Sequence, residues 1–192
     1  LRDQALFVGD LLVEKIGGPP VKPYDLALSF KPMATDKGES LYRRSLYTYW
    51  KRTGPSPAMM ALDASKRDVC RVQRSRTSSP LQTLVLMNGP QFVEAARGLA
   101  ADVLRTAKPD THRVQQVFTR LTSRPASPQE LDILEGLYAT QLEAFRNSPE
   151  AAEAYLKVGT QPIPSGVNMA ELAATTAVAN ALLGLDEVMM KR

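Results

Sequence analysis

The first sixteen residues carry apolar side chains at the spacing of a helix. The repeat consists of Leu1, Ala5, Val8, Leu12 and Ile16. Spacings of three and four residues place these side chains on one helix face. The run Gly17-Gly18-Pro19-Pro20 follows. Because Gly ends helices readily and Pro cannot continue them, the pattern predicts that the first helix ends there.

Residues 17–78 lack a sustained helical period. Residues 17–40 contain four prolines and three glycines, which indicates an extended loop or a shortened insertion. In residues 41–52, LYRRSLYTYWKR, the alternating aromatic and β-branched residues favour a short strand. A helix beginning after Gly38 is the alternative. Residues 53–78 are polar, carry two prolines and show no convincing period, so no element is predicted there.

From Ser79 onward the chain contains a series of helix-start signals. Ser127-Pro128-Gln129-Glu130 is the most specific, since Ser followed three residues later by Glu forms a capping box. The other predicted starts are Ser79-Pro80, Asn88-Gly89-Pro90, Asp110, Ser148-Pro149 and Asn168 with Glu171. Apolar stripes follow these starts: Leu81, Leu84, Val85 and Leu86; Phe92, Ala96, Leu99 and Val103; Val114, Val117, Phe118 and Leu121; Leu131, Leu134, Tyr138, Leu142 and Phe145; Leu172, Val178, Ala179, Leu182 and Leu183.

These patterns predict a mainly α fold. We expect a helical bundle of about six or seven helices, with at most a short strand or hairpin in residues 41–76. Residues 1–192 are interpreted as a single domain, with 17–40 as the loop or shortened insertion and 79–190 as the helical core. Because the chain opens with Leu1 and shows no targeting signal, we interpret it as a piece of a longer protein.

Composition limits the chemistry. The 192 residues are 44% hydrophobic and 23% charged, as in ordinary globular proteins. One Cys and one His exclude an intrachain disulfide framework, a c-type haem attached in this chain and a zinc site built mainly from these residues. We therefore expect no metal or cofactor in this chain. No apolar run approaches the ~18–20 residues of a transmembrane helix.

The positive charge is concentrated in one segment. The net charge is +4, but between Lys37 and Arg76 ten Lys and Arg face three acids, giving +7, and the remainder carries −3. This distribution predicts an anion-facing surface or a set of internal Arg pairs. It argues against a protein that coats nucleic acid.

The arginine- and aromatic-rich segment is the strongest candidate for a binding site. Arg binds carboxylate, sulfate or phosphate through two parallel hydrogen bonds, and flat aromatic rings stack on sugars or bases. The segment could therefore form a surface for a carbohydrate, an anion or single-stranded nucleic acid. The candidate ligand-binding residues are Arg43, Arg44, Tyr47, Trp50, Arg52, Asp63, Arg71, Arg74, Arg76 and Asn88. In the alternative interpretation the aromatic rings belong to the core and the arginines pair internally. In either case we expect Asp63 to contact Arg44, Arg74 or Arg76.

Other reactive side chains have simpler interpretations. Cys70 lies among arginines that would lower a thiol pKa, but it has no neighbouring His base, so a structural role is favoured. His112 is interpreted as a polar residue near a helix start. No catalytic residues are predicted. A site, if present, is expected beside residues 43–52 and 71–88 and not within helices 110–157.

Four stretches resemble domain of unknown function 1553, also called a planctomycete-specific domain. They are VEKIGGPPVKPY (13–24), YRRSLYTYWKRTGPSPAMMALDAS (42–65), DVCRVQRSRTSSPLQTLVLMNGPQFVEAARGLA (68–100) and ELAATTAVANALLGLDEVMM (171–190). The chain departs from the family pattern at Gly89, Thr175 and Gly184, where members often have Asp, Trp and Asn. The resemblance implies the C-terminal module of an extracytoplasmic bacterial protein, periplasmic or secreted. Such proteins also carry domain of unknown function 1549 and often a cytochrome-c-like domain, so any haem would belong to an upstream domain.

Three functions are compatible with these observations. The first is a non-catalytic accessory module that docks onto upstream domains of the same polypeptide or another partner. The second is a module that binds a polysaccharide or an anionic ligand through residues 43–76. The third is an enzyme with an unrecognised site assembled from distant Arg, Asp, Tyr and Asn residues.

Overall fold

The computed structural model describes residues 1–24, 34–51, 54–66, 70, 72–73, 77–106 and 113–189. The chain forms two compact units. The first unit comprises Leu1–Leu11 and Leu86–Arg192, and the second comprises Leu12–Val85. One domain over residues 1–192, with 17–40 as a loop and 79–190 as a helical core, stays a prediction.

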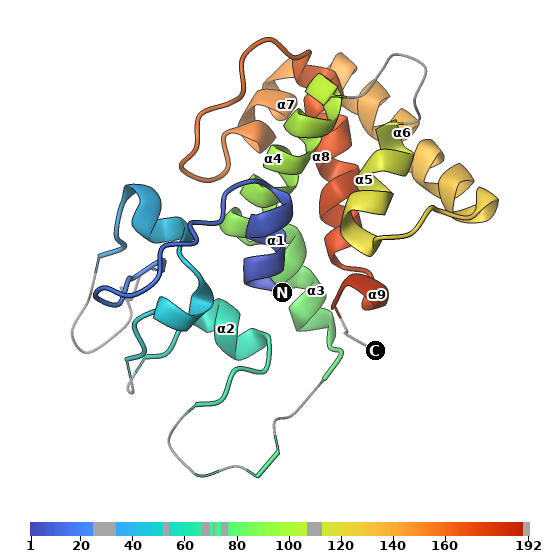
Figure 1. The fold of residues 1–192 in the computed structure, drawn as a ribbon. Helices are drawn as coiled ribbons and strands as arrows, with labels where there is room; N and C mark the ends of the chain where they lie inside the picture. The colour runs from blue at the N-terminus through green and yellow to red at the C-terminus, as the bar shows by residue number, and fades with distance from the viewer. Residues whose placement is uncertain are drawn as a thin grey trace. The chain divides into compact units, whose positions relative to one another are not determined.

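The first unit is built from α-helices (Figure 1). They are α1 (Arg2–Val8), α4 (Pro90–Thr106), α5 (Arg113–Thr122), α6 (Pro128–Asn147), α7 (Pro149–Leu156), α8 (Met169–Leu183) and α9 (Asp186–Met189). Helix α3 (Pro80–Asn88) begins in the second unit, and its last three residues belong to the first. The prediction of a mainly helical protein is confirmed. Among the described residues, the α-helices that the sequence did not predict are α9 and the five-residue α2 (Pro57–Ala61).

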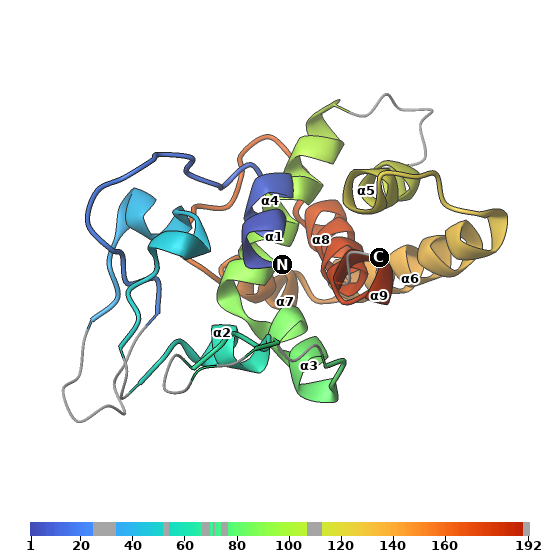
Figure 2. The same cartoon turned by 60° about the horizontal axis from the view of Figure 1, so that its bottom comes forward.

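Helix α8 is the centre of the first unit. It contacts α4, α5, α6, α7 and α9, and Figure 2 shows it between α4, α5 and α6. A helix surrounded in this way must be apolar on all sides. The hydroxyls of its two buried threonines are hydrogen-bonded within the helix. Thr175 donates to the carbonyl of Glu171, and Thr176 donates to the carbonyl of Leu172.

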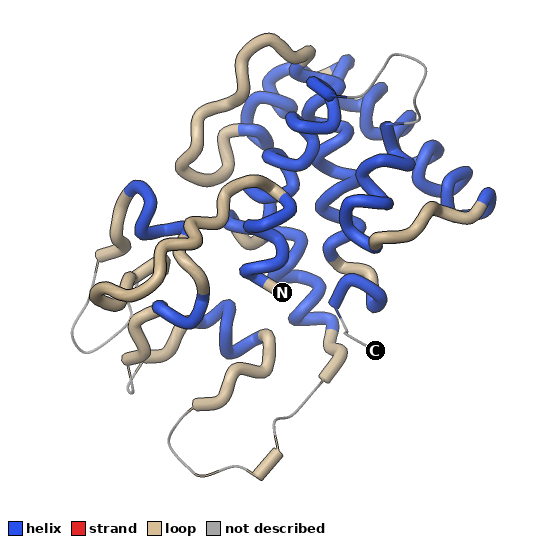
Figure 3. The backbone as a smooth tube through the Cα atoms, in the orientation of Figure 1, coloured by secondary structure: helices blue, strands red, loops and turns tan. Residues whose placement is uncertain are grey.

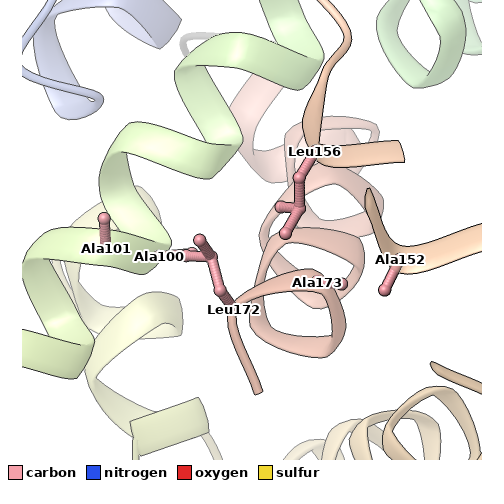
Figure 4. Close-up of a cluster of buried hydrophobic side chains, with 6 residues drawn as sticks. All are labelled: Ala100, Ala101, Ala152, Leu156, Leu172 and Ala173. Carbon is pink, nitrogen blue, oxygen red and sulfur yellow. The ribbon is translucent and has the colours of Figure 1, made fainter. Parts of the chain in front are cut away.

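One cluster of the core joins α4, α7 and α8 (Figure 4). Its buried members are Ala100, Ala101, Ala152, Leu156, Leu172 and Ala173. Partly buried Leu104, Phe145, Tyr155, Ile163 and Val167 pack against them. The four alanines bring the helices close together, and the leucines fill the remaining space. The predicted α4, α5 and α8 stripes are buried, whereas in the α6 stripe only Leu134 is.

The predicted caps at Ser79, Ser127 and Asn168 are confirmed, whereas Ser148 precedes α7 without a side-chain cap hydrogen bond. The Ser127 hydroxyl accepts a hydrogen bond from the amide of Glu130, and the Glu130 carboxylate accepts one from the amide of Ser127. The Asn168 side chain accepts from the amide of Glu171. These contacts satisfy amides that a helix start leaves without intrahelical partners. The predicted cap Asp110 lies outside the described residues.

Helix α1 is shorter than predicted. The sequence pattern extended it to Ile16, but the helix ends at Val8, and Ile16 is exposed. The amide of Leu11 donates to the carbonyl of Leu6, and the amide of Asp10 donates to the carbonyl of Phe7. Asp10 has a φ of 54°. This is a Schellman motif with Asp at the position that usually holds Gly. The prediction was wrong because the stop lies at Asp10, ahead of the glycine pair.

Two glycines allow α1 to end against α4. A Cβ atom added to Gly98 would collide with the backbone oxygen of Gly9, and one added to Gly9 would lie 2.5 Å from that of Ala95. Only hydrogen at both positions permits this backbone approach. The glycine pair therefore fixes where the N-terminal helix packs.

A buried ion pair holds the connection between α7 and α8. Arg97 and Glu94 on α4 are 2% and 3% exposed. The Arg97 guanidinium donates to the carbonyls of Leu156, Val158 and Gln161, and the Glu94 carboxylate accepts from the amides of Thr160 and Gln161. The two charged groups are 3.7 Å apart. Because both are paired and hydrogen-bonded, their burial is tolerated.

The second unit contains little regular structure (Figure 3). Its helical segments are η1 (Gly38–Tyr42), η2 (Ser45–Tyr47), α2 and the start of α3. Within the described residues two isolated parallel bridges join Val13 to Arg43 and Val21 to Thr48, and no sheet forms. The strand favoured over residues 41–52 is therefore wrong. One-turn 3-10 helices lie there because the segment pairs with residues 13–21 only at separate points.

Candidate functional site

Arg43 organises the loop that contains Gly17 and Gly18. Its guanidinium donates to the carbonyls of Lys15 at 2.9 Å, Gly17 at 2.5 Å and Pro19 at 3.3 Å. The same group lies 4.1 Å from the ring centroid of Tyr47, a cation–π distance. Arg43 is buried, so its donors face the chain's own carbonyls. This geometry supports the interpretation of internally paired arginines.

The other described aromatic candidates also contact the backbone. The Tyr47 hydroxyl accepts from the amide of Gly17 at 3.0 Å, and the Trp50 indole nitrogen donates to the carbonyl of Lys66 at 3.2 Å. Both side chains are half-buried. Their polar atoms therefore help to hold this loop-rich unit in one conformation.

Asp63 is hydrogen-bonded to residues fourteen and nineteen positions further along the chain. Its carboxylate accepts from the Thr77 amide at 2.7 Å, the Thr77 hydroxyl at 2.9 Å and the Gln82 side-chain amide at 3.0 Å. The hydrogen bond from the Thr77 amide is the main reason why the pKa of Asp63 is lowered. Asp63 has a φ of 61°, a conformation that Asp tolerates better than most residues. We call this arrangement of Asp63, Thr77 and Gln82 the neck.

The predicted contact of Asp63 with an arginine can be compared with the structure only for Arg44. Among the described residues its carboxylate contacts Thr77 and Gln82, and the Arg44 side chain is exposed. Arg74 and Arg76 lie outside the described residues, so their pairing with Asp63 stays a prediction.

The structure brings only some of the candidate residues together. Arg43 and Tyr47 are in contact, while Asn88 is an exposed residue at the end of α3. Arg52 and Arg71 lie outside the described residues, as does His112. Cys70 is exposed. The candidate ligand-binding set as a whole therefore stays a prediction.

Helix α3 carries the feature that the sequence analysis missed. Leu81 and Leu84 are each 57% exposed, and Met87, three residues further along, is 47% exposed. The stripe was expected to be buried, but α3 buries Leu86 and the polar Gln82 instead. A signal was present: apolar residues at 81, 84, 85, 86 and 87 surround the helix, so one face cannot hide them all. We call Leu81 and Leu84 the α3 apolar row.

The described residues contain neither a cluster of metal ligands nor a helix that could span a membrane. No three His, Cys, Asp or Glu side chains are grouped in a way that could hold a metal ion there. Across the same part of the chain, every helix is too short or too polar to cross a bilayer.

The fold and this site define a mainly helical protein with a basic, loop-rich unit. A family model described as PSD1, protein of unknown function (DUF1553), matches residues 1–138 of the 192, and the chain belongs to this family. The resemblance found in the sequence is thereby confirmed. Its fourth stretch, 171–190, lies beyond the matched range. No curated protein and no solved structure matches the chain.

Proposed function

We propose that this chain is a non-catalytic accessory module that docks onto another domain of an extracytoplasmic, multidomain bacterial protein. The α3 apolar row carries this proposal. Two leucines exposed three residues apart on one helix present the kind of apolar surface that protein contacts cover. Covering the exposed half of each would contribute about 1 kcal/mol or more.

The contacts of the arginine- and aromatic-rich segment support the same proposal. Arg43, Trp50 and Asp63 direct their polar atoms to the chain itself. The Arg43 guanidinium is therefore not available for a two-point contact with an external anion. The arrangement of the three side chains is what a rigid scaffold for a docking surface requires.

A module that binds a polysaccharide or an anion is the second candidate function. The exposed side chain of Arg44, three residues before the half-buried Tyr47, favours it. A calorimetric titration with a sulfated oligosaccharide tests this function. Saturable binding that Arg44→Ala abolishes would support it, and an unchanged titration would count against it.

Site-specific photo-crosslinking in cells that produce the whole protein tests the docking function. The amino acid p-benzoylphenylalanine is placed at position 84, and the matched control is position 133. Ile133 is an apolar residue of α6 that is 71% exposed. We expect position 84 to crosslink to a protein segment outside residues 1–192 and position 133 not to. No such crosslink at 84, or equal crosslinks at both positions, would contradict the proposal.

A further inference from the structure

Asn180 is a polar side chain in the interior of the first unit. It lies on the central helix α8 and is 5% exposed. Its side-chain nitrogen Nδ2 donates to the backbone carbonyl of Met87 at 2.7 Å. Met87 belongs to the same unit and lies in the last turn of α3, where helix carbonyls lack intrahelical partners. Asn180 therefore caps the end of α3 and attaches it to α8.

This hydrogen bond fixes the orientation of the Asn180 side-chain amide. A backbone carbonyl can only accept, so the nitrogen Nδ2 must face Met87 and the oxygen Oδ1 must point away from it. Oδ1 is buried, and no donor among the described residues reaches it. Because a buried acceptor without a donor loses its hydrogen bonds to bulk water, this atom requires a partner.

The hydroxyl of Tyr155 has the complementary requirement. Tyr155 lies on α7, where its ring stacks on that of Phe145 with 5.8 Å between the centroids. The hydroxyl oxygen accepts a hydrogen bond from Nδ2 of Asn180 at 3.5 Å. In the part of the chain that the structure describes, no group accepts the proton of this hydroxyl. Burial raises the pKa of Tyr155, so the hydroxyl keeps its proton at neutral pH and remains a donor.

The acceptor without a donor and the donor without an acceptor are close enough for one small molecule to join them. The nitrogen and oxygen of a side-chain amide lie about 2.2 Å apart, as their bond lengths require. Because Nδ2 is 3.5 Å from the Tyr155 hydroxyl, Oδ1 is at most about 5.7 Å from it. Two successive hydrogen bonds through a single oxygen atom span about 5.5 Å.

We infer that one buried water molecule joins Tyr155 to Asn180. The water accepts the proton of the Tyr155 hydroxyl and donates one of its own to Oδ1 of Asn180, so both groups gain the partner they require. A metal ion does not fit this pair, because it cannot accept a hydrogen bond. The water links α7 to α8 beside the capped end of α3. This inference does not depend on the proposed docking function.

A high-resolution crystal structure of the protein tests the inference. We expect a water oxygen about 2.5–3.0 Å from both Oδ1 of Asn180 and the Tyr155 hydroxyl. Tyr155→Phe keeps the ring but removes the donor, so the water should be lost from the structure of this variant. Tyr138→Phe removes the hydroxyl of another half-buried tyrosine, on α6, and is the matched control that should retain the water.

Several outcomes would overturn the inference. In the wild-type protein these are a direct hydrogen bond from the Tyr155 hydroxyl to Oδ1, a protein donor on Oδ1, or a different molecule at this position. A water that stays in place in Tyr155→Phe would show that the tyrosine does not hold it. Loss of the water in both variants would show that the effect is not specific to Tyr155.

Discussion

The two units of the chain are stabilised in different ways. In the first unit, capped helices surround the buried α8, and alanine and leucine side chains fill the space between them. In the second unit the buried apolar residues among those described are Val21, Leu41 and Tyr42. Its order depends on side chains that bond to backbone groups, with Arg43 and Asp63 as the main examples.

This difference affects how each unit should respond to substitution. Apolar burial is spread over many contacts, so the helical unit should lose most stability where a buried charge or a close backbone contact is disturbed. In the loop-rich unit each polar contact holds a particular loop, so substitutions should act locally. Four predictions test this contrast, in order of decreasing effect.

Arg97→Ala should cause the largest loss of stability. It removes the donors to the carbonyls of Leu156, Val158 and Gln161 and leaves Glu94 buried without its cation. Breaking a buried pair of this kind costs about 3–5 kcal/mol. Urea denaturation measures the change in the free energy of unfolding. Arg105→Ala, at an exposed position of the same helix, is the control and should stay within about 0.5 kcal/mol.

Gly98→Ala should destabilise the contact between α1 and α4. The added Cβ would meet the backbone oxygen of Gly9, which cannot rotate away as a side chain would. We expect a loss of about 1–3 kcal/mol in thermal or chemical unfolding. Gly136→Ala on α6 is the matched control, because its Cβ would meet open space and Ala favours helices by up to about 1 kcal/mol. Equal effects of the two substitutions would contradict the close approach of α1 and α4.

Arg43→Lys tests the loop-rich unit. Lysine keeps the charge but loses the planar group that reaches the carbonyls of Lys15 and Gly17 together. We expect the free energy of opening this loop locally to fall by about 1–2 kcal/mol. Hydrogen exchange should show faster exchange at the amide of Gly17 but unchanged exchange in α8. Arg44→Lys, at the exposed neighbouring position, should change neither, and a global effect of Arg43→Lys would disprove the local role.

The smallest expected effect concerns the pKa values of two carboxylates, Glu130 and Asp63. Hydrogen bonds from Arg124 are the main cause that lowers the pKa of Glu130 to about 2, whereas neutral donors lower the pKa of Asp63. A folded-state pKa below the unfolded value stabilises the protein above the unfolded pKa, and this contribution is lost as the pH falls through the folded pKa. For Glu130 that window lies between about pH 4.5 and 2.

NMR titration of the two side chains checks this. Arg124→Ala should move the pKa of Glu130 toward 4.5, its ordinary value, and leave that of Asp63 unchanged. High salt should raise the pKa of Glu130 toward its ordinary value but have little effect on Asp63, since screening acts on the charge pair. Equal responses of both groups to salt would show that the two units do not differ in this way.

The sequence alone determined where most helices begin. Caps such as Ser127 with Glu130 and Asn168 with Glu171 involve residues three positions apart, so the local sequence contains the whole interaction. The apolar stripes of α4 and α5 predicted their buried faces for the same reason, because helical spacing follows from backbone geometry. The family resemblance also depended on sequence alone.

Only the tertiary structure decided the features that join distant residues. Arg97 bonds to carbonyls about sixty positions away, and Gly98 meets Gly9 across the α1–α4 contact. The role of Arg43 was equally hidden, since nothing near it in sequence shows that carbonyls at 15–19 will surround its guanidinium. Exposure of the α3 apolar row likewise depends on which neighbours cover a helix. Periodicity shows on which face of a helix a side chain lies. The residues that it contacts on that face come from distant segments of the chain, which the local sequence does not contain.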